Sequence, residues 1–297
     1  MMGRKFEEGD WAEVYSEAKS IPLYGWSNLN IDIMYKGLGV EHKMLCYRSK
    51  PRVTEACGST LMHPAATRSI RVPDPDTDPQ DAMRDILGQY GDLIDQRRAK
   101  VQETSRRAKP DMRTGWLLWQ ESLREFLYFE EEMLRPDPAD YYAEWSSRGA
   151  GGARKGSTSL WIYERETGRK RYSVTTSAGA KIQPYFDVPP PNDPNLYVFT
   201  VQAEEMGGGR VRIWVTEATA HDLRRMLGGL DAKTISSAII DASKVFNADE
   251  AAKVTVSRAA EPIVLEASAY AALQAMFPGS VSDEHLAQLF VQYLHTA

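Results

Sequence analysis

The sequence predicts a mixed α/β (α+β) protein in which helices flank a mixed β-sheet, with a β-rich section and a helical C-terminal part after it. Three features of the hydrophobic pattern support this prediction. The N-terminal half contains apolar residues at helical spacing on either side of a short hairpin pattern. Between Leu160 and Val215 the spacing becomes that of strands, and from Thr219 to His295 helical spacing returns.

Composition sets the broad class of protein. The 297-residue chain, with 42% hydrophobic and 26% charged residues, resembles an ordinary globular protein with one large core or two domains. No apolar run approaches the roughly 18 residues of a membrane span, and the N-terminus lacks the apolar segment of a secretory signal. Two cysteines, Cys46 and Cys57, without metal-ligand spacing favour a reducing, cytoplasmic location and no zinc site.

The first predicted element is an amphipathic helix over residues 7–19, with Asp10 as its N-cap. Its apolar stripe consists of Trp11, Val14, Tyr15 and Ala18. Glu13 and Glu17 lie four residues apart on another face of this helix, where solvent exposure is the ordinary role of such side chains.

Residues 30–45, NIDIMYKGLGVEHKML, predict two short antiparallel strands joined by a glycine turn. A loop centred on Gly37 and Leu38 would pair Tyr35 with Val40, Met34 with Glu41 and Asp32 with Lys43. Because side chains alternate along a strand, Asp32, Glu41 and Lys43 would then share one face. A register change of one residue would move Asp32 to the opposite face.

Two carboxylates and an ammonium group in one place suit a magnesium-dependent hydrolase. Mg²⁺ takes hard oxygen ligands, keeps several waters and is often completed by substrate phosphate. Lys43 could orient or help to deprotonate a water molecule. The simpler interpretation is that Glu41 and Lys43 form an ion pair on a solvated edge, but the flanking Val40, Met44 and Leu45 indicate a buried strand.

Asp32 followed by Glu41-His42-Lys43 resembles the D…ExK signature of the PD-(D/E)xK nuclease superfamily, which includes many restriction endonucleases. The resemblance covers about fifteen residues and has Ile31 in place of the name-giving proline. It implies a restriction-endonuclease-like fold and a Mg²⁺-dependent deoxyribonuclease, with Mn²⁺ as a substitute. Asp32, Glu41 and Lys43 would be catalytic, and Asp32 and Glu41 would bind the metal, with Glu13 or Glu17 as a further ligand. The implied partners are double-stranded DNA and a second copy of the chain.

The charge distribution bears on a nucleic-acid partner. The net charge of −5 argues against one, but two stretches are locally basic, from Lys43 to Arg71 and from Trp145 to Tyr185. Such stretches fit a focused phosphate-binding cleft, although either could be a solvated face. The predicted DNA-binding residues are Arg48, Lys50, Arg52, Arg68, Arg71, Arg154, Lys155, Arg169, Lys170 and Arg171.

Further elements follow in order. Asp78 and Pro79 predict the start of a helix that runs to about Arg107, and apolar spacing predicts another over 113–134 and a short one after Pro138. The Gly-rich stretch 146–159 lacks the order of a phosphate loop and predicts a boundary.

The second half is predicted to contain two hairpins and then helices. The hairpins pair 160–163 with 172–176 and 196–201 with 211–215. Helices are predicted over 219–227, 232–246, 267–277 and 283–295. The resulting division is a nuclease core (1–146), a β-rich section that completes the sheet or forms a DNA-contacting layer (157–217), and a helical C-terminal region (218–297).

The leading hypothesis is therefore a metal-dependent endonuclease that hydrolyses DNA phosphodiester bonds, of the site-specific restriction type. The alternative is a non-catalytic nucleic-acid-binding or assembly protein on the same fold. In that case the acid–lysine cluster would be a buried ion-pair network.

Overall fold

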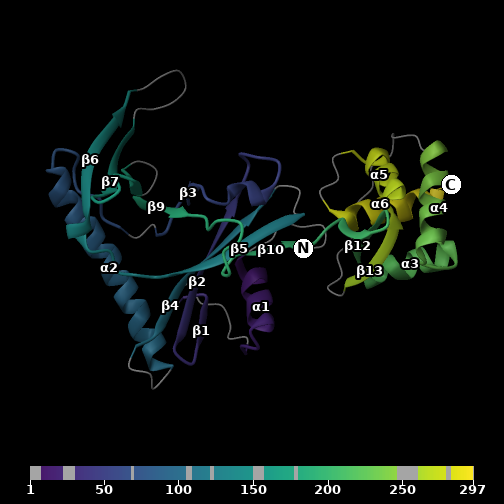
Figure 1. Cartoon of the computed structure of the whole chain (residues 1–297), viewed down its shortest axis with the longest axis horizontal. Coiled ribbons are helices and arrows are strands. Elements are labelled where there is room, and N and C mark those ends of the chain that lie inside the picture. The colour runs from purple at the N-terminus through teal and green to yellow at the C-terminus, as the bar shows by residue number, and fades with distance from the viewer. Residues whose placement is uncertain are drawn as a thin grey trace.

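A computed structural model describes residues 8–22, 31–67, 70–104, 109–120, 124–149, 157–176, 180–245, 260–278 and 282–296. These residues form a mixed α/β structure with six α-helices and three β-sheets (Figure 1). The mixed α/β class predicted from the sequence is therefore confirmed, although the C-terminal region predicted to be helical also contains the strand β13 (Ala260–Glu266). No helix of the described chain is both long and apolar enough to cross a membrane.

The first sheet has five strands in the order β1-β2-β4-β5-β10. They span Ile33–Tyr35, Leu38–Cys46, Asp111–Trp119, Glu125–Glu132 and Tyr197–Thr200. The sheet is mixed because β2 and β4 run parallel, whereas the other neighbours are antiparallel.

Helices pack on both faces of this sheet. The helix α1 (Glu8–Ala18) inserts Trp11 and Tyr15 into a cluster with Val40 on one face, as the apolar stripe predicts. The helix α2 (Pro79–Glu103) packs Ile94 and Val101 over the other face. The N-cap predicted at Asp78 is confirmed, since its side chain accepts hydrogen bonds from the first-turn N–H groups of α2. The N-cap predicted at Asp10 is wrong, because Asp10 lies within α1.

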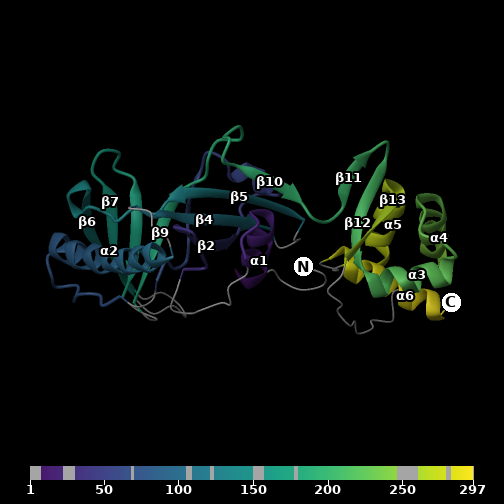
Figure 2. The ribbon, with the colours of Figure 1, turned by 90° about the horizontal axis from the view of Figure 1, so that it is seen from below.

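The second sheet is antiparallel and shares α2 with the first. Its strand order is β3-β9-β8-β7-β6, with bounds Thr60–Met62, Lys181–Asp187, Lys170–Thr175, Ser157–Glu164 and Tyr141–Arg148. The N-terminal half of α2 covers one face, where Ile86 and Leu87 pack against Leu160 and Ile162 (Figure 2). The predicted hairpin of 160–163 and 172–176 is present as β7 and β8.

The third sheet belongs to the C-terminal part. Its strands β11 (Glu204–Gly207), β12 (Arg210–Thr216) and β13 (Ala260–Glu266) are antiparallel. The helices are α3 (Glu217–Leu227), α4 (Ala232–Val245), α5 (Ala267–Met276) and α6 (Asp283–Thr296), close to the predicted ranges. Each of β12 and β13 leads into two helices, so the region consists of two strand–helix–helix units around one core.

The helix predicted over 113–134 is wrong, because this segment forms β4 and β5. Both faces of β4 are buried, Leu117 against α1 and Trp116 against the second sheet, so its apolar run does not alternate as a half-exposed strand would. The helix predicted after Pro138 is also wrong. A 3-10 turn, η2 (Pro138–Asp140), leads directly into β6.

The second predicted hairpin is wrong in its pairing. The glycine turn at Gly207–Gly209 joins β11 to β12, whereas β10 pairs with β5 and extends the first sheet. The β-rich section is thus distributed over all three sheets. Most of the Gly-rich stretch 146–159 lies outside the described residues.

Candidate active site

The hairpin predicted to carry the catalytic residues exists, but its turn lies one residue earlier than predicted. Lys36 and Gly37, both with positive φ, form the turn, and Tyr35 pairs with Leu38 and Ile33 with Val40. The predicted pairing of Tyr35 with Val40 is therefore wrong by two residues. A two-residue shift leaves the faces unchanged. Continued along the strands, the observed register places Asp32 opposite Glu41 rather than Lys43.

Asp32 is bound to the neighbouring strand by a hydrogen bond. Its Oδ2 accepts the backbone N–H of His42 at 2.6 Å. Since that nitrogen is bonded to the carbonyl carbon of Glu41, Asp32 Oδ2 lies at most about 5 Å from the Glu41 Cα. The Asp32 carboxylate is therefore beside Glu41, although Asp32 does not line the cavity described below.

Glu41 and Lys43 are in direct contact on one face of β2. Lys43 Nζ donates to Glu41 Oε1 at 2.6 Å, and the Arg97 guanidinium of α2 donates to the same oxygen at 3.1 Å. The side chains of Glu41, Lys43 and Arg97 are only 8%, 14% and 20% exposed, respectively. The cluster itself carries two positive charges and one negative charge, whereas the side chains that line the whole cavity include seven acids and four bases.

This cluster lies in the wall of a cavity of about 490 Å³ between the two five-stranded sheets. Glu41 and Lys43 contribute from β2, Tyr90 and Arg97 from α2, and Glu131 from β5. Burial raises the pKa of Tyr90 to about 12, so its hydroxyl stays protonated and able to donate.

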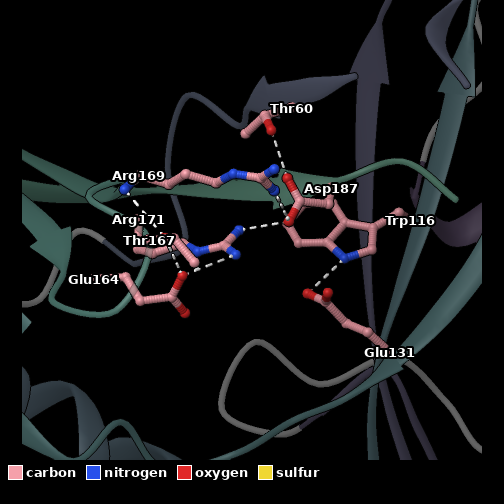
Figure 3. Close-up of polar contacts among 8 residues, drawn as sticks. All are labelled: Thr60, Trp116, Glu131, Glu164, Thr167, Arg169, Arg171 and Asp187. Atoms are coloured by element: carbon pink, nitrogen blue, oxygen red, sulfur yellow. Dashed lines mark hydrogen bonds and ion pairs between the residues drawn. The ribbon is translucent and has the colours of Figure 1, made fainter. Parts of the chain in front are cut away.

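The opposite wall contains a network of ion pairs from the second sheet (Figure 3). Arg171 bridges Asp187 at 2.8 Å and Glu164 at 3.4 Å, and Arg169 lies 3.6 Å from Asp187. Burial alone would raise the pKa of Asp187, but hydrogen bonds from Thr60 and Arg171 outweigh it and lower the pKa. Asp187 therefore remains ionised and holds Arg171 in the wall of the cavity, with Arg169 beside it.

Glu131 is another carboxyl group that lines the cavity. The strand registers align Glu41, Thr114 and Glu131 in one row across β2, β4 and β5. Burial raises the pKa of Glu131, against the opposing effect of the hydrogen bond that its Oε1 accepts from Trp116 Nε1 at 2.8 Å (Figure 3). Two strand spacings separate Glu41 and Glu131, about 10 Å at the backbone, which leaves room for a phosphodiester.

The donor set fits a magnesium ion that is completed by water and substrate. Both cations contact Oε1 of Glu41, so within the described chain Oε2 has no hydrogen-bond or ion-pair partner. The described residues contain no group of three or more His, Cys, Asp or Glu side chains placed to hold a metal. Mg²⁺ commonly uses only one or two carboxylates with water and phosphate, and Glu41 Oε2 is one such oxygen in the wall of the cavity.

Comparison of the chain with protein-family models, curated proteins and solved structures finds no significant match.

The further metal ligands suggested by the sequence do not reach the site. Glu13 and Glu17 are exposed on α1, which covers the sheet face opposite to Glu41 and Lys43. Neither glutamate can therefore share an ion with Glu41.

The predicted DNA-binding residues are dispersed. Arg171 lines the cavity and Arg169 pairs with Asp187 next to it. Arg52 pairs with Glu125, and Arg71 pairs with Asp85. Lys170 lies over the Trp161 ring on the other face of the second sheet. Arg48 and Lys50 follow β2 directly, beyond the residues that line the cavity. Arg68, Arg154 and Lys155 lie outside the described residues.

Sequence reasoning did not identify Tyr90, Arg97 or Glu131 as site residues. Tyr90 and Arg97 are seven residues apart, so two helical turns place them on one side of α2, and this polar stripe was a detectable signal. Glu131 could not be found because β5 was expected to be helical.

Proposed function

We propose that the protein is a metal-dependent endonuclease that hydrolyses phosphodiester bonds in DNA. The observation that carries the proposal is the buried contact of Glu41 with Lys43 and Arg97 in the wall of a polar cavity, with the Asp32 carboxylate beside it. A carboxylate pair, a lysine and an arginine in this arrangement are the groups that phosphodiester hydrolysis requires.

The residues of the site divide the chemistry between them. Glu41 Oε2 and the Asp32 carboxylate would hold Mg²⁺, or Mn²⁺ in its place, and the bound ion would supply Lewis-acid activation of the phosphate and of water. Lys43 is held by Glu41, so its ammonium is fixed to orient the attacking water and to stabilise the developing negative charge. Arg97 and Arg171 reach the cavity from opposite walls and would bind the phosphates. Glu131, with its raised pKa, would protonate the leaving oxygen.

The arrangement of the first sheet supports a restriction-endonuclease-like core. Its central strands β2 and β4 are parallel, α2 connects them, and helices pack on both faces. We extend the proposal to site-specific cleavage of double-stranded DNA by a homodimer in which each subunit cuts one strand. These finer features follow from the resemblance of the Asp32, Glu41 and Lys43 pattern to the PD-(D/E)xK nucleases.

The test is a cleavage assay on supercoiled plasmid and genomic DNA with Mg²⁺, Mn²⁺, Ca²⁺ or EDTA. Cutting with Mg²⁺ that disappears in EDTA and in the Lys43→Ala and Glu41→Gln variants is the expected result. Lys244→Ala is the matched control, because Lys244 is an exposed lysine on α4 that pairs with the exposed Asp241. Its activity should equal that of the unaltered protein.

The assay also separates the alternative function. Metal-independent binding of nucleic acid without cleavage of any DNA or RNA would favour a non-catalytic binding protein, in which Glu41, Lys43 and Arg97 are a structural ion-pair network. Cleavage that persists in folded Lys43→Ala and Glu41→Gln proteins would exclude this site as its source.

A further inference from the structure

The second sheet has a face that no hydrophobic core uses. Along β7, Leu160 and Ile162 point into the core under α2, so Trp161 and Tyr163 point to the other side. On β6 the same alternation buries Ala143 and turns Tyr142 outward. We call this side, with Tyr142, Trp161, Tyr163, Lys170 and Tyr185, the aromatic face.

Two rings of the aromatic face stack on each other, and a cation lies among three of the rings. Tyr142 and Tyr163 are cross-strand partners whose rings stack with centroids 5.1 Å apart and planes at 15°. The Lys170 ammonium lies 3.2 Å from the Trp161 ring centroid, 5.7 Å from that of Tyr163 and 5.8 Å from that of Tyr185. Four rings and one ammonium thus form a continuous surface across four strands.

This surface is accessible in the described structure. All four rings are only partly buried, and none belongs to any of the five hydrophobic clusters. The helix α2 lies against the other side of the sheet (Figure 2). Aromatic residues of this size ordinarily contribute to a core, so their collection on the outer side of one sheet indicates a ligand with flat, partly apolar groups.

The chemistry of the face fits single-stranded nucleic acid. Every base has a π-face that can stack on an aromatic side chain, and a neighbouring ammonium can contact the phosphate between two bases. The face provides Lys170 beside the rings and Lys181 from β9 on the same side of the sheet, together with one acid, the exposed Glu144 opposite Trp161. Because the bases of a duplex are stacked inside it, the ligand of this face would be an unpaired segment that adjoins the duplex proposed as the substrate.

The aromatic face is continuous with the cavity of the candidate active site. Tyr185 lines that cavity and also lies within 5.8 Å of the Lys170 ammonium. A strand that leaves the cavity past Tyr185 would therefore reach Lys170, Trp161 and Tyr163 next.

We propose that the aromatic face binds a single-stranded segment of nucleic acid by base stacking, next to the site of hydrolysis. The inference deepens the proposed function and rests on it for the identity of the ligand. It assigns Tyr163 and Trp161 to bases and Lys170 to a phosphate.

The test measures binding without cleavage. A fluorescently labelled oligothymidylate is titrated in EDTA with Lys43→Ala protein, and its anisotropy gives Kd. Added to this background, Tyr163→Leu should weaken binding at least about fivefold, which corresponds to the lower end of base-stacking energies. Tyr163→Phe should bind as before because it keeps the ring. Tyr197→Leu removes an exposed tyrosine from β10 of the first sheet and serves as the matched control.

The role of Lys170 is tested separately, by the salt dependence of binding. Because a phosphate contact releases counterions, Lys170→Gln should reduce the slope of log Kd against log salt concentration by about 0.7 for a single strand. Circular dichroism of each variant establishes that the sheet is intact.

Equal Kd values for the Tyr163→Leu and Tyr163→Phe proteins, or no binding of the oligonucleotide at all, would overturn the inference. Competition by a proline-rich peptide but not by unlabelled oligonucleotide would overturn it too, because the face would then bind protein. Cleavage of plasmid by otherwise unaltered Tyr163→Leu protein in these cases would leave the proposed function in place.

Discussion

The carboxylate of Asp32 accepts the backbone N–H of His42, which a backbone carbonyl would accept if the hairpin continued. In the register of the hairpin, the N–H of His42 would pair with the carbonyl of Ile31. The pairing ends at Ile33, and the Asp32 side chain accepts this N–H at 2.6 Å instead. One residue thus terminates β1, satisfies a donor of β2 and brings a carboxylate to Glu41.

Replacement of Asp32 should separate its structural role from its proposed catalytic one. Asp32→Ala leaves the His42 N–H without its acceptor and should lower the free energy of unfolding by about 1–3 kcal/mol. Asp32→Asn keeps an acceptor oxygen and should lose less stability, while the loss of charge should abolish metal-dependent cleavage in both variants. Urea denaturation and plasmid cleavage measure the two effects. Equal stability of the two variants would contradict the structural role.

The buried cluster of Glu41, Lys43 and Arg97 should be sensitive to loss of its anion. Glu41→Gln leaves two buried cations without their counter-charge and should cost about 3 kcal/mol or more in unfolding free energy. Asp81→Asn is the matched control, because its partner Arg84 and Asp81 itself are largely exposed and such pairs contribute little. A Glu41→Gln protein as stable as the Asp81→Asn protein would show that the cluster is well solvated.

Phosphate or sulfate should partly restore the stability of the Glu41→Gln protein, since an anion can replace the lost charge beside Lys43 and Arg97. The measurement is the midpoint of thermal unfolding at increasing sulfate concentration, compared with Asp81→Asn under the same conditions. A parallel rise in both proteins would indicate only a general salt effect.

Two glycines, Gly115 beside His42 and Gly88 on α2, allow a crowded position to be compared with an open one. A Cβ added at Gly115 in β4 would clash with Tyr128 Oη and lie 2.7 Å from His42 Nδ1, so Gly115→Ala should destabilise the protein by about 1–3 kcal/mol. A Cβ at Gly88 in α2 would meet nothing within 4 Å, so Gly88→Ala should stabilise it by roughly 0.5–1 kcal/mol through helix propensity. Chemical denaturation of both variants should give changes of opposite sign.

Stability should fall on mild acidification because of buried histidines. Burial lowers the pKa of both His42 and His63 to about 4, below the ordinary value of 6.5. Between pH 4 and pH 6.5 the unfolded chain therefore binds more protons than the folded chain. The stabilising contribution is complete above pH 6.5 and is lost as the pH falls toward 4, by up to about 3 kcal/mol for each residue.

The His42→Leu variant should lose part of this pH dependence. Both ring nitrogens of His42 are buried without a hydrogen-bond partner in the described structure, so an apolar side chain suits the site. The exposed His221 gives the control variant, His221→Leu. Unfolding free energies at pH 5 and pH 7 should differ less for His42→Leu than for the control.

The sequence was a good guide to elements with one buried face. The helices α1 and α2, the four C-terminal helices and the hairpin of β7 and β8 each alternate between apolar and polar residues with a clear period. The sequence pattern did not predict β4, because a strand covered on both sides has no such alternation. Trp116 and Trp119 then occur at helical spacing by coincidence.

Only the part of the candidate site that is formed by residues close together in the sequence could be predicted. Glu41 and Lys43 share a strand face, so their contact follows from a separation of two residues. Asp32 joins them through a tight turn, and the two-residue error in register was harmless because faces repeat with that period. Arg97, Glu131 and Arg171 enter the cavity through long-range packing of α2, β5 and β8, which no local pattern encodes.

The parallel pairing of β2 and β4 has a consequence for synthesis of the chain. Glu41 and Lys43 leave the ribosome early, but β4 can pair with β2 only after α2 has been made, and the opposite wall needs residues as far as Asp187. A nascent chain or a fragment that ends before β9 would contain Glu41 and Lys43 without the opposite wall of the cavity. The proposed catalytic pair therefore acquires its site only once the second sheet has been made.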